Sequence, residues 1–278
     1  MADIVHGERY DVAPGVVRIT APNPGVMTGP GTNSYIVGTR ELALIDPGPS
    51  IDSHIEKLIE TVGDRLKWIL CTHTHLDHSP AAQALARATG ATVCGRTAAQ
   101  DGRQDPDFAP ARVLEDGERV TIEGATLRAV HTPGHASNHL CYLLEEQKLL
   151  FTGDHIMQGS TVVISPPGGD MLDYLRSLEK LFSIDLARIA PGHGHPIETP
   201  LEEARRLIAH RLKREQKVAD ALARKHPATL DELVPLAYDD VNERLYPVAK
   251  RSLHAHLIKL EREGRAGLEG DCWSPLTR

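Results

Sequence analysis

Four side chains that can bind a metal ion follow one another in the pattern H-x-H-x-D-H, at His73, His75, Asp77 and His78. Histidine nitrogens and carboxylate oxygens are ordinary protein ligands of zinc and of similar cations. A spacing of two residues directs His73 and His75 to the same side of an extended chain, so both imidazoles can hold one cation. We expect the chain to turn after them, so that Asp77 and His78 reach a second cation. The pattern therefore predicts a site for two metal ions.

Three further candidate ligands each follow an apolar run and stand next to a glycine. They are His135 in the segment T-P-G-H, Asp154 in L-F-T-G-D and His193 in P-G-H-G. Glycine allows the sharp turn that brings a side chain back over the end of a strand. Strand ends that meet at one edge of a sheet are where such ligands would converge. The chain contains 15 histidines, and nine of them lie between positions 73 and 195, as expected of a metal site.

Together these motifs resemble the metallo-β-lactamase superfamily over residues 33–195, in its branch of two-metal hydrolases that includes glyoxalase II and phosphodiesterases. The resemblance implies that the first metal is held by His73, His75 and His135, the second by Asp77, His78 and His193, and that Asp154 bridges the two. It also implies that a metal-bridging hydroxide is the nucleophile and that Asp77 is the catalytic residue that orients it. True β-lactamases of this fold generally lack the bridging carboxylate, so antibiotic hydrolysis is disfavoured. The expected cofactors are two zinc ions, with manganese or iron as alternatives.

Other polar residues near these motifs are expected to support the site without binding metal. Asp46 follows an apolar strand and matches the aspartate of the superfamily's first motif, while His131 and His139 flank His135 at four residues on either side. We expect all three to hydrogen-bond to the ligands or to line the pocket. Cys71 is expected to fill the core rather than to act as a nucleophile. Five further histidines are expected at the surface: His54, His210, His226, His254 and His256.

The elements that would position these ligands are short strands separated by Gly and Pro turns, with a few helices between them. Apolar runs predict strands at residues 15–19, 33–37, 42–45 and 68–71 and hairpins at residues 120–130 and 139–152. Periodic apolar positions predict helices at residues 51–62, 80–89 and 171–182, the second of them capped by Ser79. Strands grouped between helices indicate an α/β fold in which two sheets face each other with helices outside. With the resemblance, this is the four-layer αββα metallo-β-lactamase sandwich.

The chain changes character at about residue 200, which predicts a catalytic domain over residues 1–200 and a smaller domain over residues 201–278. The second part is charged and helical. Helices are expected at residues 201–225 and 247–263, with a short one between them where Thr229 and Glu232 form a capping box. A turn at Gly270 predicts a two-stranded wing. This order of elements indicates a small C-terminal winged-helix-like domain.

The composition narrows the class of protein. The 278 residues carry 31 Lys and Arg against 38 Asp and Glu, a formal charge of −7, so no overall basic field attracts nucleic acid or an anionic membrane. Four cysteines without C-x-x-C spacing favour a reducing compartment. No apolar run is long enough to span a membrane. We therefore expect a cytoplasmic protein with no membrane partner, while the oligomeric state stays open.

The C-terminal part bears on the substrate. A metal domain followed by a winged helix resembles the lactamase-β-like endoribonucleases, which cut single-stranded RNA, and also thioesterases that act on carrier proteins. For substrate RNA, five basic residues could contact phosphates: Lys250, Arg251, Lys259, Arg262 and Arg265. This places phosphodiester hydrolysis slightly ahead of hydrolysis of an acyl-thioester or another ester, as in glyoxalase II. A third alternative is a non-catalytic winged-helix regulator with a metal-containing sensor domain.

Overall fold

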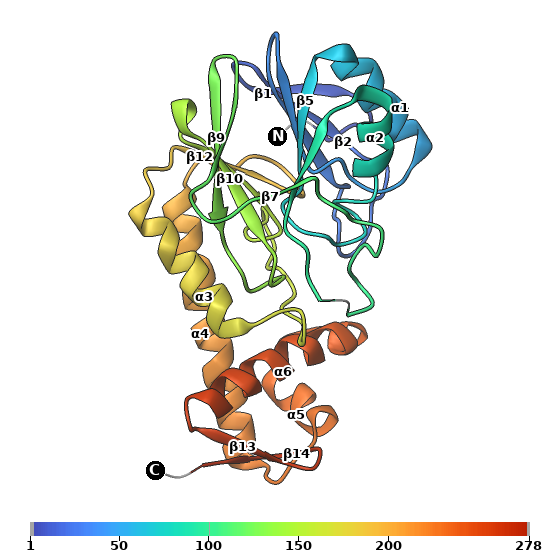
Figure 1. The fold of residues 1–278 in the computed structure, drawn as a ribbon. Coiled ribbons are helices and arrows are strands. Elements are labelled where there is room, and N and C mark those ends of the chain that lie inside the picture. Colours follow the sequence, from blue (N-terminus) through green and yellow to red (C-terminus); the bar gives the residue numbers. More distant parts are fainter. Residues whose placement is uncertain (1–2, 100, 277–278) are drawn as a thin grey trace.

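The computed structural model describes residues 3–99 and 101–276, which contain three sheets (Figure 1). The first sheet has the order β1-β2-β3-β4-β5-β6-β7, made of β1 Arg9–Ala13, β2 Val16–Thr20, β3 Asn33–Gly38, β4 Leu42–Ile45, β5 Leu66–Leu70, β6 Thr92–Gly95 and β7 Arg112–Val113. The second has the order β12-β11-β10-β9-β8, made of β8 Arg119–Ile122, β9 Ala125–His131, β10 Leu140–Leu144, β11 Leu149–Gly153 and β12 Arg188–Pro191. Two C-terminal strands, β13 Ala266–Glu269 and β14 Cys272–Pro275, form the third.

The two large sheets share one apolar core. Tyr35, Leu70, Tyr142 and Phe151 lie in this core, and each is at most 2% exposed. Strands β4, β5, β6 and β7 pair in parallel, and β11 pairs in parallel with β12. The carboxyl ends of parallel strands meet at one edge of a sheet, so the turns that follow them can share a site.

Helices cover the outer faces of both sheets. Helices α1 Asp52–Val62 and α2 Ala82–Thr89 bury Leu58, Val62 and Leu85 against the first sheet. Helix α3 Met171–Lys180 and the first half of α4 Pro200–Arg224 pack on the second sheet. The predicted αββα order of layers is confirmed, and Figure 1 shows α1 and α2 on the opposite side of the sheets from α3 and α4. Short 3-10 helices are η1 Gly63–Arg65, η2 Glu145–Gln147, η3 Leu181–Ser183 and η4 Glu243–Leu245.

The predicted start of the second helix is wrong. Helix α2 begins at Ala82, after a turn, and Ser79 is not its cap. The Ser79 hydroxyl donates instead to Asp105 Oδ2 at 2.9 Å. The Ser79 hydroxyl therefore bonds to a residue 26 positions away in the chain, and not to the backbone at the start of the helix.

The C-terminal region is built from the second half of α4, α5 Leu230–Ala237, α6 Tyr246–Arg262 and the β13–β14 hairpin. Thr229 and Glu232 form the expected capping box at the start of α5. The core of this region contains Leu222, Leu253 and Trp273, each at most 2% exposed. Helices followed by a two-stranded wing confirm the winged-helix arrangement.

Helix α4 belongs to both regions. Ala204 and Leu207 near its start pack in the core beneath α3, whereas Val218 and Leu222 pack in the C-terminal core. Ala255 of α6 also enters the core beneath α3. A continuous helix and shared apolar packing therefore join the two regions, and the boundary at residue 200 stays a prediction.

Two histidines expected at the surface are buried. The His54 imidazole lies 3.0 Å from the Ser34 hydroxyl, and His256 of α6 lies 3.8 Å from the Glu215 carboxylate of α4. Both face inward from helices, where their neighbours come from other elements.

None of the described helices combines the length and the apolar composition needed to cross a bilayer.

Candidate metal centre

The candidate ligands gather where strands of both sheets end. The turn after β5 carries His73, His75, Asp77 and His78. His135 lies in the loop between β9 and β10, Asp154 directly follows β11, and His193 lies two residues after β12. The structure brings all seven side chains together. His73 and His75 lie beyond the end of β5, where His75 forms an isolated antiparallel β-bridge with Gln104 and the chain turns only at residues 76–78.

Three imidazole nitrogens form the first group. His75 Nδ1 lies 2.9 Å from His73 Nε2 and 2.9 Å from His135 Nε2. Burial, followed by the nearby histidines, lowers the pKa of His73 well below its usual value, and burial also lowers the pKa of His75 and of His135. The rings are therefore neutral at pH 7, and their nitrogens converge on one point. A shared cation stabilises such an arrangement, because neutral imidazole is a good metal ligand.

Two imidazoles and two carboxylates form the second group. Asp77 Oδ2 lies 3.5 Å from His78 Nε2 and 3.4 Å from His193 Nε2. Asp154 Oδ1 lies 3.3 Å and 3.2 Å from the same two nitrogens. Although burial opposes the shift, the carboxylates raise the pKa of His78 well above normal and that of His193 to about 9. Burial also opposes ionisation of the two carboxyls, but the same histidines lower the pKa of Asp77 and of Asp154.

Asp154 lies between the two groups and faces one of them with each carboxylate oxygen. Its Oδ1 atom faces His78 and His193, whereas its Oδ2 atom lies 3.4 Å from His135 Nε2. The side chain is only 11% exposed, so water has little access to its oxygens. This is the position that a bridging ligand requires.

Asp46 fixes the orientation of two histidines. His78 Nδ1 donates to Asp46 Oδ2 at 2.8 Å, and the Thr72 hydroxyl donates to the same oxygen at 2.8 Å. Because Thr72 has a single hydroxyl proton, its oxygen accepts from His73 Nδ1 at 3.0 Å. Both imidazoles therefore present Nε2 as the free nitrogen. The geometry gives Asp46 the supporting position expected from the sequence.

Backbone carbonyls orient two other histidines. His135 Nδ1 donates to the Val163 carbonyl at 2.9 Å, and His193 Nδ1 donates to the Gly31 carbonyl at 3.1 Å. A hydrogen bond of this kind fixes both the ring and its tautomer. Sequence reasoning missed these partners, because every residue has a carbonyl and none is marked by its side chain.

Asn33 anchors the loop that carries His193. Its Nδ2 atom donates to the carbonyls of Pro191 at 3.0 Å and Gly194 at 2.9 Å, and its backbone N–H donates to Gly192 at 2.8 Å. The side chain is fully buried at the start of β3. A polar residue beginning an apolar strand was a signal that could have pointed to this role.

The two histidines that flank His135 differ in what they contact. His139 is buried, and its ring centroid lies 5.1 Å from that of His73. His131 is partly exposed, and its Nε2 atom donates to the Ser137 carbonyl at 3.1 Å. His139 thus packs against a candidate ligand, and its Nδ1 atom lies 3.0 Å from the Thr132 hydroxyl rather than from a ligand. The hydrogen bond of His131 goes instead to the loop that carries His135.

Two glycines allow the ligand loops to come this close. Gly153 has a φ of 45°, and a Cβ added there would lie 2.4 Å from Thr72 Oγ1. Gly134 has a φ of 138°, and a Cβ there would lie 2.3 Å from the Tyr174 Cα. Each glycine directly precedes a candidate ligand, so a side chain at either position would displace that ligand.

The two groups fit metal cations. Ligands about 2.1 Å from a tetrahedral metal lie about 3.4 Å from one another, close to the separations of 2.9 Å to 3.5 Å found here. Three buried atoms of the second group have no hydrogen-bond partner among the described residues: His78 Nε2, Asp154 Oδ1 and His193 Nε2. Buried polar atoms of this kind are costly unless an ion satisfies them. The donor set therefore fits two cations without identifying the metal.

A cavity of about 620 Å³ connects the ligands to the C-terminal region, and we call it the interdomain cavity. One end is lined by His75, Asp77, His135 and Asp154. The other end is lined by residues of α4 and α6, among them Arg211, Ala249 and Ser252. A substrate bound in this cavity would present its reacting group to the candidate ligands.

An αββα sandwich with histidines and aspartates gathered at its strand ends defines a class of metal-dependent hydrolases. Residues 27–193 match the family model of the Metallo-beta-lactamase superfamily, and residues 229–273 match that of the Beta-lactamase associated winged helix domain. The chain therefore belongs to the metallo-β-lactamase superfamily, whose members are generally hydrolases.

Relatives cover most of the chain. A Beta-lactamase-like protein 2 homolog of Drosophila melanogaster is 34% identical over 90% of this chain and 89% of its own length. An Atrochrysone carboxyl ACP thioesterase of Aspergillus fumigatus is 36% identical over 76% of this chain and 66% of its own length. The crystal structure of a metallo-beta-lactamase family protein from Thermus thermophilus has a TM-score of 0.80 and 24% identity, covering 95% of this chain and 100% of its own. The last likeness shows that the fold extends through both regions.

Proposed function

We propose that this protein hydrolyses acyl thioesters at a pair of bound metal ions, with the acyl chain lying in the interdomain cavity. The observation that carries the proposal is the apolar wall of that cavity beside the metal centre. Its apolar lining residues are Val26, Met27, Leu76, Met157, Val162, Val163, Val241, Leu245, Val248 and Ala249. Such a wall binds a hydrocarbon chain through the hydrophobic effect.

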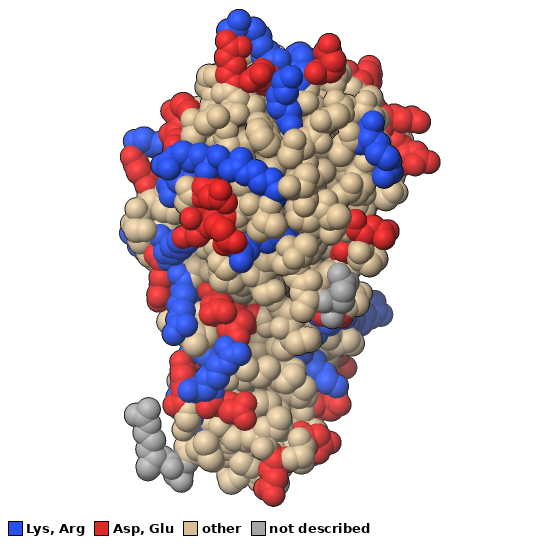
Figure 2. All heavy atoms as spheres, in the orientation of Figure 1, with Lys and Arg blue, Asp and Glu red and all other residues tan. Residues whose placement is uncertain are grey.

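The basic residues of the C-terminal region favour a thioester over RNA. Four of the five residues expected to contact phosphates form ion pairs: Lys250 with Asp231 at 2.6 Å, Lys259 with Glu215 at 2.8 Å, Arg262 with Asp170, and Arg265 with Glu215 at 3.0 Å. A cation that already has a carboxylate partner gains less from a phosphate, and nucleic-acid binding depends on many such contacts. Figure 2 shows acidic and basic side chains interleaved on the visible face of this region.

The residues of the site have distinct roles in the proposed reaction. When bound, a pair of divalent cations lowers the pKa of water toward neutrality and polarises the thioester carbonyl. Zinc suits the nitrogen-rich donor set, with manganese and iron as alternatives. Asp77 is 26% exposed and lines the cavity, where its carboxylate can orient the attacking water and accept a proton from it. The apolar wall holds the acyl chain so that its carbonyl lies at the ligands.

A relative supports the choice of bond. The Aspergillus fumigatus protein that matches 76% of this chain is named as an ACP thioesterase. A thioester also suits the cavity, because the bond joins an apolar acyl chain to a carrier group.

The test is a substrate panel assayed with the metal-loaded protein. We expect hydrolysis of acyl-thioesters, loss of turnover after chelation and recovery on adding zinc. A generic phosphodiester and a single-stranded RNA should be hydrolysed at least about 100-fold more slowly. RNA cleaved faster than every thioester would show that phosphodiesters are the substrate. Turnover of none of them by fully metallated protein would favour the non-catalytic regulator.

A further inference from the structure

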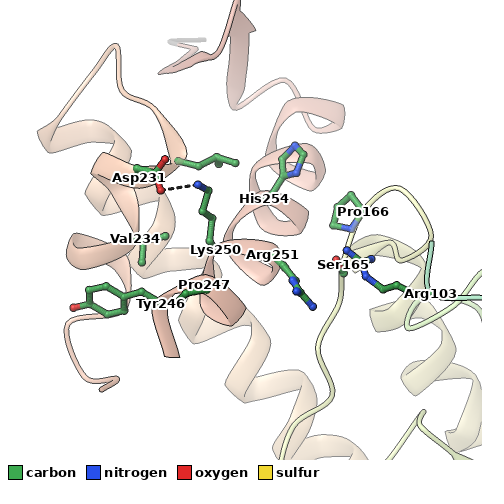
Figure 3. A pocket seen from close by; sticks show the side chains of 11 residues that line it. Arg103, Ser165, Pro166, Asp231, Val234, Tyr246, Pro247, Lys250, Arg251 and His254 are labelled. Carbon is green, nitrogen blue, oxygen red and sulfur yellow. Dashed lines mark hydrogen bonds and ion pairs between the residues drawn. The ribbon is translucent and has the colours of Figure 1, made fainter. Parts of the chain in front are cut away.

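A second cavity of about 460 Å³ lies beside the interdomain cavity. It is bounded by α5, α6 and the segment at Ser165 and Pro166. Arg103, Ser165 and Arg251 line both cavities, so these three residues mark the junction between them. Figure 3 shows Arg251 extending from α6 toward Ser165, with the Arg103 side chain on the other side of the same segment.

The two arginines at this junction differ in their ion pairing. Arg251 forms no ion pair with any described residue, and its side chain is exposed. Arg103 forms a long ion pair, at 3.8 Å, with the buried carboxylate of Asp101, which also lines the interdomain cavity. By contrast, the neighbouring Lys250 is held by Asp231 at 2.6 Å. Two guanidinium groups that line one junction, one of them without an ion pair and the other in a long one, suit an anion that accepts several hydrogen bonds, such as a phosphate.

The position of this junction relates it to the metal centre. The interdomain cavity has candidate metal ligands at one end and Arg251 on α6 at the other, where Arg103 also lines the junction with the second cavity. An elongated substrate that places its thioester at the ligands therefore brings a more distant group to the arginines. Among thioesters, the phosphopantetheine arm combines a sulfur at one end with a phosphate at the other.

We infer that Arg103 and Arg251 bind the phosphate of a phosphopantetheine arm, while the thioester at the other end of that arm lies at the metal centre. This inference rests on the proposed thioester hydrolysis and specifies its substrate class. Arg251 is the one basic residue of the five singled out in the sequence that has no carboxylate partner among the described residues. Its role is therefore recognition of a single phosphate and not of a nucleic-acid backbone.

The experiment compares two substrates that carry the same acyl group, acyl-4′-phosphopantetheine and acyl-pantetheine. The metal-loaded wild-type protein should show a kcat/KM at least about tenfold higher for the phosphorylated substrate, mainly through a lower KM, as expected for roughly 1.4 kcal/mol of binding. Arg251→Gln and Arg103→Gln should each reduce this ratio several-fold, and the double variant should bring it close to one. Arg224→Gln, an exposed arginine at the end of α4, is the matched control and should keep the wild-type ratio.

Equal kcat/KM values for the two substrates in the wild type, or an unchanged ratio in the double variant, would overturn the inference. Calorimetric titration with 4′-phosphopantetheine separates this result from a failure of the proposed function. Binding that the double variant loses supports the arginine site even if no thioester is hydrolysed, whereas equal binding by both proteins contradicts it. Repeating the ratio with acyl-coenzyme A and with an acylated carrier protein shows which source of the arm depends on the arginines.

Discussion

The two ends of the interdomain cavity are built in opposite ways. The metal end is polar, and its candidate ligands all come from turns and loops that follow strands of the sandwich. The far end is formed by α4, α6 and nearby loops, and it combines apolar residues such as Val248 and Ala249 with the arginines Arg211, Arg214 and Arg251. Short local motifs create the first, whereas the second exists only because the C-terminal region packs against the sandwich. The difference implies that substitutions at the far end can change the substrate preference of the protein without disturbing the candidate metal ligands.

One contact nevertheless joins the two ends. Arg211 of α4 is buried, donates to the Val162 carbonyl and lies over the Tyr174 ring at 5.2 Å. The adjacent Val163 carbonyl accepts the hydrogen bond from His135. The helix that links the regions thus fixes the segment that orients a candidate ligand.

Loss of the bridging carboxylate is the largest expected perturbation of the metal end. Asp154→Ala should lower kcat by more than about 100-fold and should reduce the metal content, because both groups lose an oxygen. Steady-state turnover and metal analysis measure the two effects. Asp173→Ala, at a partly exposed position of α3, is the matched control. Wild-type turnover and metal content in Asp154→Ala would show that the bridging assignment is wrong.

A smaller effect on metal binding is expected from Asp46, which hydrogen-bonds to a candidate ligand and has no place in either ligand group. Asp46→Asn should weaken the binding of metal by about 10-fold to 100-fold, because Asp46 orients His78 directly and His73 through Thr72. Competition with a chelator of known affinity measures the change. Asp52→Asn at the exposed start of α1 serves as the control. An unchanged metal affinity in Asp46→Asn would show that Asp46 does not support the candidate ligands.

Changes in the apolar wall of the interdomain cavity should alter chain-length preference and leave metal binding intact. Ala249→Leu places a larger side chain in the interdomain cavity, so kcat/KM for long acyl chains should fall about tenfold relative to short ones. Ala88→Leu, at an exposed position of α2, makes the same change away from the cavity. The measurement is kcat/KM across a series of acyl lengths. Parallel profiles for the two variants would mean that the acyl chain binds elsewhere.

The smallest effect on turnover is expected from the interface between α4 and α6. Glu215 there is buried and faces His256, Lys259 and Arg265. Although burial opposes the shift, these neighbours lower the pKa of Glu215 to about 2. A carboxyl whose pKa is depressed on folding stabilises the protein above its unfolded pKa of about 4.3, and this contribution is lost as the pH falls toward 2.

Glu215→Gln should therefore lower the free energy of unfolding by about 1 to 2 kcal/mol at pH 7, since solvent screens part of the interaction. Urea denaturation at pH 7 and at pH 3 measures the effect. The difference between variant and wild type should shrink at the lower pH. A difference that is the same at both pH values would show that the ionised carboxylate does not provide the stability.

Much of the sandwich, and the gathering of the candidate ligands, could be predicted from the sequence, because the signals were local. Apolar runs ending in Gly and a His or Asp located the strand ends, and the dense pattern at residues 73–78 marked the ligand turn. The capping box at Thr229 marked the start of α5 in the same way. Each of these features depends on residues within a few positions of one another.

What the sequence could not predict depends on contacts between distant segments. His54 and His256 look like surface residues on helices, yet both are buried against other elements. Ser79 looks like a helix cap, but its hydroxyl bonds to Asp105. Lys259 was expected to contact phosphate, but its Nζ atom lies 2.8 Å from the Glu215 carboxylate. The interdomain cavity could not be predicted for the same reason, since its lining comes from both regions of the chain.

Anomalous diffraction from crystals of the metal-loaded protein tests the central claim most directly. The seven side chains should surround two ions about 3.5 to 4 Å apart. One ion should contact His73, His75 and His135, the other should contact Asp77, His78 and His193, and Asp154 should touch both. A single ion, or ions bound elsewhere while these side chains stay free of metal, would contradict the account.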